Sequence, residues 1–190
     1  MPLRIFEVRY LDMIRRCIEN SAPFGIVSLL HGNEVARPEQ TESFAKIGTL
    51  ATVISHESPQ PGLRMIRCLG QQRFRTMRIE RLKHGLWVSD VSFLAQDSAV
   101  NVPNELTLCR SLFEKMLMRI PSSAQSNLFV GNPSPEQLAD CGWLANRWCH
   151  LLPLPLEMKQ RLLELESPLI RLELVSDLLD KLGLNQATGS

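Results

Sequence analysis

Alternation between apolar and polar residues dominates the first half of the chain. From Phe24 to about Ala95, β-branched and aromatic residues alternate with polar ones, and Gly, Pro and Asn punctuate the runs. Residues 31–43 are polar and contain Gly and Pro, which predicts a surface loop. One strand face is expected to carry Ala45, Ile47, Thr49, Ala51 and Val53. The pattern predicts strands at 24–30, 44–55, 63–69, 73–82 and 86–94.

Within the segment 73–79, the apolar residues change from one strand face to the other. Phe74 falls on one strand face, whereas Met77 and Ile79 fall on the other. We therefore predict a β-bulge or bend near Thr76. Such kinks let a small antiparallel sheet curl into a barrel, which also removes exposed strand edges.

Helical spacing occurs near the N-terminus and again beyond Asn104. Residues 3–10 form an extended apolar segment that leads into an amphipathic helix carrying Leu11, Ile14, Cys17 and Ile18. In the second half, apolar residues recur every three or four positions, at Leu106, Cys109, Leu112, Phe113, Met116 and Leu117. The second half is therefore predicted to be helical.

Proline, glycine and capping residues set the expected helix ends. Pro121 should end the first helix of the second half, and Ser134 should cap the next. That second helix is expected to turn inward Leu138, Cys141, Leu144, Ala145 and Trp148. Two further helices are predicted at 157–165 and 169–182, before Gly183. The sequence thus predicts an α+β fold, with a β-rich domain at 1–100 and a helical bundle at 101–190.

Composition narrows the class of protein. The chain has 190 residues, 44% of them hydrophobic, and a formal net charge of +1. No apolar run reaches the roughly 20 residues of a membrane span, and no signal peptide precedes the fold, so we expect a cytoplasmic location. The five cysteines are scattered among apolar residues, which favours reduced core thiols over disulfides or zinc ligands.

No catalytic or cofactor-binding pattern is found. Cys149 and His150 are adjacent, but neighbouring helical residues point about 100° apart, so a packed thiol beside a surface imidazole is the favoured interpretation. The other histidines are His31, His56 and His84. None of them has a Cys, Asp or His nearby in the sequence at the spacing of metal ligands. There is no Gly-rich phosphate loop. We expect no catalytic residue, no metal and no cofactor.

Two features suggest binding surfaces. Trp143 and Trp148 are five residues apart on one helix, so one of them can be partly exposed and offer an aromatic surface to a peptide, but packing of both between helices is the favoured interpretation. The most basic stretch contains Arg64, Arg67, Arg73, Arg75, Arg78, Arg81 and Lys83. Acidic residues interrupt this stretch and it lacks a stacking platform, so a solvated strand face is favoured over nucleic-acid binding.

Several separated motifs occur in the order seen in one known family. They are Ile5-Phe6-Glu7 with Arg9-Tyr10, Phe24-Gly25-Ile26-Val27, Ile47-Gly48-Thr49-Leu50-Ala51, Gly70 with Arg73-Phe74-Arg75, Leu152-Pro153-Leu154, Lys159-Gln160-Arg161-Leu162-Leu163-Glu164 and Arg171-Leu172. Together they resemble the LON substrate-binding domain, the N-terminal domain of ATP-dependent Lon proteases, which also occurs as a stand-alone protein. The resemblance implies a β-rich, PUA-like pseudo-barrel followed by a helical bundle.

The resemblance also implies a function without catalysis. The ATPase and peptidase parts of Lon have no counterpart in this sequence, so we expect a recognition module for unfolded or extended polypeptide segments, with a protease or another protein as a further partner. Family members have a strand of the type "LFPL…LFPG" before the first segment seen here. Its apparent absence predicts an exposed sheet edge, which can promote a homodimer.

The candidate site residues follow from this expectation. For peptide binding they are Phe6, Tyr10, Phe24, Phe74 and Trp87, of which the first four are family motif positions that can equally serve the fold. Backbone pairing along a strand edge would supply sequence-tolerant affinity. The alternative is nucleic-acid or small-ligand binding through the PUA-like sheet, with phosphate contacts from Arg73, Arg75 and Arg78.

Overall fold

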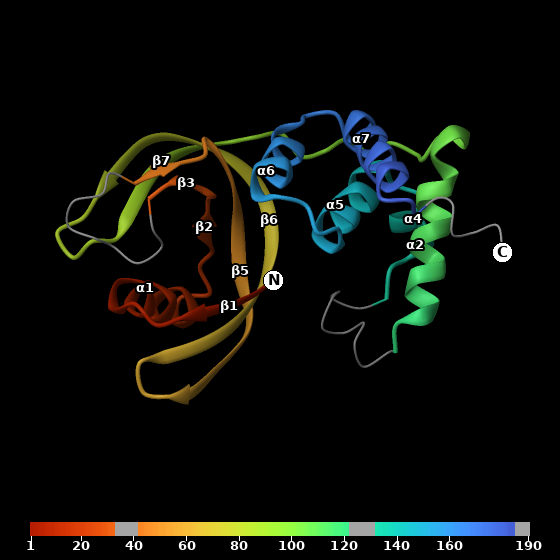
Figure 1. The fold of residues 1–190 in the computed structure, drawn as a ribbon. Helices are drawn as coiled ribbons and strands as arrows, with labels where there is room; N and C mark the ends of the chain where they lie inside the picture. The colour runs from red at the N-terminus through yellow and green to blue at the C-terminus, as the bar shows by residue number, and fades with distance from the viewer. Residues whose placement is uncertain (33–41, 122–131, 185–190) are drawn as a thin grey trace. The chain divides into compact units, whose positions relative to one another are not determined.

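The chain divides into two compact units, Met1–Gln96 (unit 1) and Asp97–Ser190 (unit 2). The structure is a computed structural model, and it describes residues 1–32, 42–121 and 132–184. Unit 1 is rich in strands and unit 2 in helices, so the predicted α+β class is confirmed (Figure 1).

Unit 1 is built around one curved antiparallel sheet. The sheet has the strand order β1-β6-β5-β2, and β7 also pairs with β6, while β3 and β4 form a separate ribbon. The long strands β5 and β6 curve around α1 (Figure 1). In chain order the elements are β1 (Pro2–Ile5), α1 (Val8–Glu19), β2 (Phe24–Ile26), β3 (Leu29–His31), β4 (Ser43–Phe44), β5 (Ile47–Gln60), β6 (Leu63–Arg81) and β7 (Trp87–Phe93).

Two strand predictions were wrong in their boundaries. The segments 63–69 and 73–82, predicted as separate strands, form the single strand β6, because an extra residue between Gly70 and Arg73 is absorbed as a bulge against β5. The segment 24–30, predicted as one strand, divides into β2 and β3. The bulge expected near Thr76 is confirmed, since the β6–β7 register shifts between Thr76 and Ile79.

The loop predicted at 31–43 is shorter at both ends than expected. His31 belongs to β3 and Ser43 to β4, and these two residues pair with each other. Residues 33–41 lie outside the described residues, so the rest of this prediction is untested.

The core of unit 1 lies between α1 and the sheet. Ile14 of α1 is fully buried, and it packs in a cluster with Phe24, Ala51, Ile66 and Cys68. The N-terminal amphipathic helix predicted from the sequence is thus confirmed. The extended segment at the start of the chain is β1, which pairs with β6. The helix α1 follows directly and covers the sheet with its apolar face.

Unit 2 consists of short helices. In its described residues they are the 3₁₀ turn η1 (Asn104–Leu106), α2 (Thr107–Arg119), α4 (Pro135–Leu138), α5 (Cys141–Leu151), α6 (Leu156–Glu164) and α7 (Pro168–Lys181). The sequence predicted one helix after Ser134, but two are present. Ser134 caps α4 in a capping box with Gln137, and Asp140 then caps α5 by accepting a hydrogen bond from the Trp143 amide at 2.7 Å.

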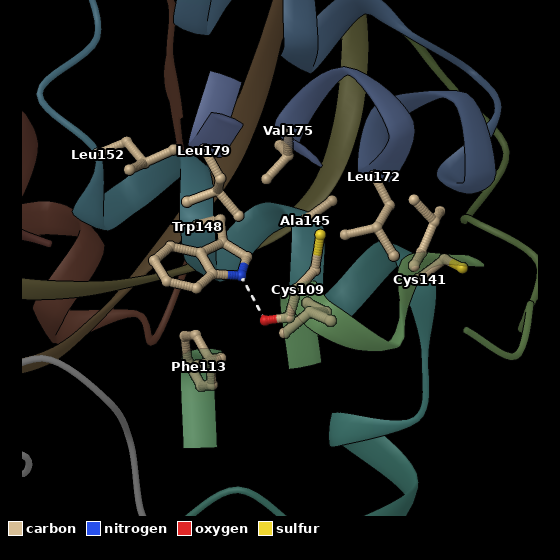
Figure 2. Packing of buried hydrophobic residues seen from close by; sticks show 11 residues of the cluster. Cys109, Phe113, Cys141, Ala145, Trp148, Leu152, Leu172, Val175 and Leu179 are labelled. Atoms are coloured by element: carbon tan, nitrogen blue, oxygen red, sulfur yellow. Dashed lines mark hydrogen bonds between the residues drawn. The ribbon is translucent and has the colours of Figure 1, made fainter. Parts of the chain in front are cut away.

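The core of unit 2 is formed by α2, α5 and α7. Phe113 packs edge-on against Trp148, with ring centroids 5.5 Å apart, and the Trp148 indole N–H donates to the Cys109 carbonyl at 3.1 Å (Figure 2). Helix α7 contributes Leu172, Val175 and Leu179, all of them fully buried. The apolar spacing read from the sequence therefore marks the packed faces of these helices.

A buried arginine joins three segments of unit 2. Arg171 of α7 is only 1% exposed, and its guanidinium forms a bidentate pair with the Asp97 carboxylate, at 2.5 and 3.3 Å. It also donates to the carbonyls of Leu162 and Leu165 and to the side-chain oxygen of Asn146. The charge is thus compensated, as a buried charge requires.

Candidate functional site

The five predicted peptide-binding residues fall into two groups. Phe24 and Phe74 are 8% and 2% exposed and lie in the interior of unit 1. Phe6 is 57% exposed, whereas Tyr10 and Trp87 are half-buried. The structure therefore leaves ring surface accessible on Phe6, Tyr10 and Trp87, and it places Phe24 and Phe74 where they support the sheet.

Phe74 is buried because two glycines make room for its ring. A Cβ atom at Gly48 would lie 2.7 Å from the ring and 2.5 Å from the Ile26 carbonyl oxygen, and one at Gly25 would lie 3.0 Å from the ring. The distances at Gly48 are shorter than real Cβ contacts, and at Gly25 the ring would have to shift by a few tenths of an ångström. The two glycines and the phenylalanine thus form one packing unit between β2, β5 and β6.

The Glu-x-Arg-Tyr sequence at the start of α1 serves the fold. Arg9 is 8% exposed, pairs with Glu7 at 2.9 Å, and donates to the Gly85 carbonyl at 2.7 Å. Its guanidinium also lies 4.6 Å from the centre of the Tyr10 ring. Gly85 has a φ of +87°, so this turn between β6 and β7 favours glycine. The motif therefore ties α1 to the β6–β7 turn.

Trp87 fixes the beginning of β7. Its ring packs edge-on against Phe44 of β4, with centroids 5.2 Å apart, and its indole N–H donates to the Glu42 carboxylate. The Arg81 guanidinium lies 5.8 Å from the indole ring. Through these contacts Trp87 holds β7 against the β3–β4 ribbon.

The side chains of β7 that lie on the same side of the strand as Trp87 become more exposed toward the end of the strand. Side chains alternate along a strand, so Trp87, Val91 and Phe93 share one side. Val91 is 38% exposed and Phe93 is 56% exposed, and Ile79 on the neighbouring strand is 38% exposed. We call Ile79, Val91 and Phe93 the β7 face. Sequence reasoning missed it, because alternation of this kind is also the signal of a buried strand face.

β7 is also an edge strand. In the part of the chain that the structure describes, it pairs with β6 alone. The Leu94 amide donates to the Arg73 carbonyl of β6 at 3.0 Å. Because backbone groups alternate in direction along an antiparallel strand, the amides of Val91 and Phe93 point to the other, outer edge. Exposed apolar side chains and outward-pointing backbone amides thus occur at the same two residues.

The three candidate phosphate contacts differ in their surroundings. Arg75 is exposed and Arg73 is half-buried. Arg78, at the bulge, forms an exposed ion pair with Glu80 at 3.3 Å. An exposed pair of this kind contributes little energy and remains available for exchange with other anions.

A shallow cleft of about 580 Å³ lies between α1 and the tip of the β5–β6 hairpin. Its walls combine apolar residues such as Leu11 and Leu63 with the charged side chains of Arg15 and Arg64. Arg15 is paired with Asp12 at 3.2 Å. The cleft has a size typical of ligand sites, but its lining does not select one ligand chemistry.

The thiol chemistry agrees with the sequence analysis. Burial raises the pKa of Cys149 to about 11, and burial followed by the nearby Asp140 raises the pKa of Cys141 to about 11. His150 beside Cys149 is exposed. Among the described residues, no group of three or more His, Cys, Asp or Glu is placed to bind a metal ion. None of the described helices is long and apolar enough to cross a membrane.

The two tryptophans of α5 both pack against the core of unit 2, but they differ in exposure. Trp148 is 5% exposed and lies in the core of unit 2. Trp143 is half-buried and packs edge-on against Phe113, with ring centroids 5.6 Å apart. Both tryptophans therefore pack between helices, as the favoured interpretation predicted, and Trp143 keeps part of its ring exposed.

Comparison with known proteins identifies relatives of the whole chain. Residues 1–181 match the family described as the ATP-dependent protease La (LON) substrate-binding domain. A Lon N-terminal domain protein from Xanthomonas campestris is similar in structure, with 28% identity, a TM-score of 0.72, and coverage of 93% of this chain and 88% of that one. No curated protein matches the chain.

A more distant structure shares the fold. The N-terminal domain of the Mycobacterium avium complex Lon protease is 17% identical, with a TM-score of 0.53 and coverage of 93% of this chain and 88% of that one. The matched family is that of the substrate-binding domain, and no catalytic domain is matched.

Proposed function

Because the chain belongs to the LON substrate-binding domain family, we propose that it is a recognition module that binds unfolded or extended polypeptide segments at the outer edge of β7. Family membership supports a role in substrate recognition. The observation that carries the finer proposal is the coincidence, at Val91 and Phe93, of exposed apolar side chains with outward-pointing backbone amides. The proposal includes the PUA-like pseudo-barrel for unit 1, the helical bundle for unit 2, and a function without catalysis.

Strand addition suits ligands of varied sequence. Backbone hydrogen bonds to β7 require no particular side chain, and each contributes about 0.5–1.5 kcal/mol. Every second side chain of the added segment would lie beside Val91 and Phe93. Burial of the exposed parts of Val91 and Phe93 contributes about 1–2 kcal/mol more. Association entropy opposes these gains, so we expect weak, reversible binding that favours segments with alternating apolar residues.

Fluorescence anisotropy of a labelled, permanently unfolded polypeptide tests the proposal. We expect saturable binding that changes little with salt, since apolar burial and backbone pairing dominate. A single-stranded RNA of similar size is titrated in parallel. Salt-sensitive binding of the RNA alone would refute polypeptide recognition and favour phosphate contacts by the basic residues of β6.

Two pairs of variants locate the binding surface. Val91→Pro removes an outward amide, whereas Val91→Thr keeps the amide and the β-branched shape; only the proline variant should lose binding. Phe93→Ser should weaken binding about tenfold, and Met118→Ser, at a residue 85% exposed on α2 of unit 2, should not. Equal binding by all four variants would place the polypeptide elsewhere on the molecule.

A further inference from the structure

The second side of β7 is polar. Side chains alternate along a strand, so Asp90 and Ser92 point to the side opposite that of Val91 and Phe93. Both Asp90 and Ser92 are exposed. A segment that pairs with the outer edge of β7 therefore places every second side chain beside these two polar residues.

Asp90 carries a negative charge that no other charge compensates. Its carboxylate forms no ion pair with any residue that the structure describes. Asp90 lies opposite the bulge of β6, where the β6–β7 register shifts, and Arg78 at this bulge pairs with Glu80 at 3.3 Å instead. The hydrogen bond from the Ser89 hydroxyl at 2.7 Å goes to the Asp90 backbone carbonyl. The carboxylate thus remains available to a bound segment.

The charge changes sign two residues further along β7. Ser92 pairs with Arg75 of β6, so the Arg75 side chain lies on the same side of the sheet as Asp90 and Ser92. Arg75 is exposed and forms no ion pair within the described ranges. A basic residue of a bound segment is therefore favoured beside Asp90 and disfavoured beside Ser92.

We infer that Asp90 selects polypeptide segments in which a lysine or arginine follows two alternate apolar residues. The inference rests on the proposed polypeptide binding at the outer edge of β7. The described strand pairs of this sheet are antiparallel, and an added antiparallel strand continues that pattern. The apolar residues of the segment then lie beside Phe93 and Val91, in that order, and its next residue lies beside Asp90. From its N-terminal end, the recognised pattern is apolar, polar, apolar, basic.

An NMR titration of the full chain with two peptides tests the inference. The peptides contain Val-Ser-Val-Lys or Val-Ser-Val-Glu between identical serine and glycine flanks, and their ends are acetylated and amidated. The amide signals of Val91 and Phe93 report binding even when it is weak. The lysine peptide should bind about fivefold more tightly, because opposite charges across strands attract and like charges repel. This ratio should fall as salt is added, since the charges are exposed.

The two peptides also separate this inference from the proposed function. Equal affinities, with both peptides shifting the Val91 and Phe93 amide signals, would overturn selection by Asp90 and leave polypeptide binding at β7 intact. If neither peptide shifts these signals, the proposed binding at β7 is contradicted as well.

Charge variants complete the test. Asp90→Lys should reverse the preference between the peptides, and Asp90→Asn should bring the two affinities together. Glu57→Lys is the matched control, because Glu57 is exposed on β5 and its substitution changes the net charge by the same amount as Asp90→Lys. The control should keep the preference of the unchanged protein. A preference for the lysine peptide that survives in both Asp90 variants, with folding verified by circular dichroism, would overturn the inference.

Discussion

Replacement of Arg171 by methionine should destabilise unit 2 more than any surface change. Arg171 is 1% exposed and donates to four acceptor groups, among them the Asp97 carboxylate at 2.5 Å. Methionine fills similar space but removes the guanidinium from that carboxylate, whose side chain is only 21% exposed to water. Removal of one partner of a buried pair costs about 3–5 kcal/mol. For a unit of this size the melting temperature should fall by more than about 10 °C.

Urea unfolding followed by tryptophan fluorescence measures this loss, since Trp143 and Trp148 lie in unit 2. Arg110→Met is the control, because Arg110 forms only a partly exposed ion pair with Glu114 and should cost less than about 1 kcal/mol. The double variant Arg171→Met with Asp97→Leu should be more stable than Arg171→Met alone, because the negative charge that lost its guanidinium is removed as well. A loss below about 1 kcal/mol for Arg171→Met would refute the reasoning.

Three further predictions concern other residues. Gly48→Ala should destabilise unit 1 by about 2–3 kcal/mol in urea unfolding, because its Cβ would lie 2.5 Å from a carbonyl oxygen, whereas Gly70→Ala, whose nearest neighbour would lie at 3.5 Å, should change stability by less than about 1 kcal/mol. Cys149 should react slowly with alkylating reagents at neutral pH and faster as the pH approaches its pKa of about 11; fast labelling at neutral pH would contradict its burial. Arg147→Gln should raise the pKa of His150 in an NMR titration, since one repelling charge is removed, and an unchanged pKa would show that the two side chains are not close.

Local sequence signals predicted much of the fold. The apolar spacing of α2, α5 and α7 and the bulge near Thr76 follow from periodicity alone. The break between α4 and α5 was missed, because Asp140 interrupts an apolar pattern that continues across it. The signal was present, since aspartate is a strong helix-capping residue, but periodicity outweighed it.

The binding surface was harder to predict, because exposure depends on contacts distant in sequence. Phe74 is an aromatic motif residue, and only the glycines at 25 and 48 on neighbouring strands make its burial understandable. Val91 and Phe93 show the alternation of a buried strand face, yet they are exposed on an edge strand. Whether a strand lies at an edge is set by the pairing of the whole sheet, which no local pattern encodes.

Hydrogen exchange of single amides tests the central claim most directly. In the free protein the amides of Val91 and Phe93 should exchange rapidly, whereas the Leu94 amide, which donates to Arg73, should be protected. Saturation with an unfolded polypeptide should protect Val91 and Phe93 and leave the helices of unit 2 unchanged. If the polypeptide binds but these two amides still exchange rapidly, recognition does not occur by strand addition to β7.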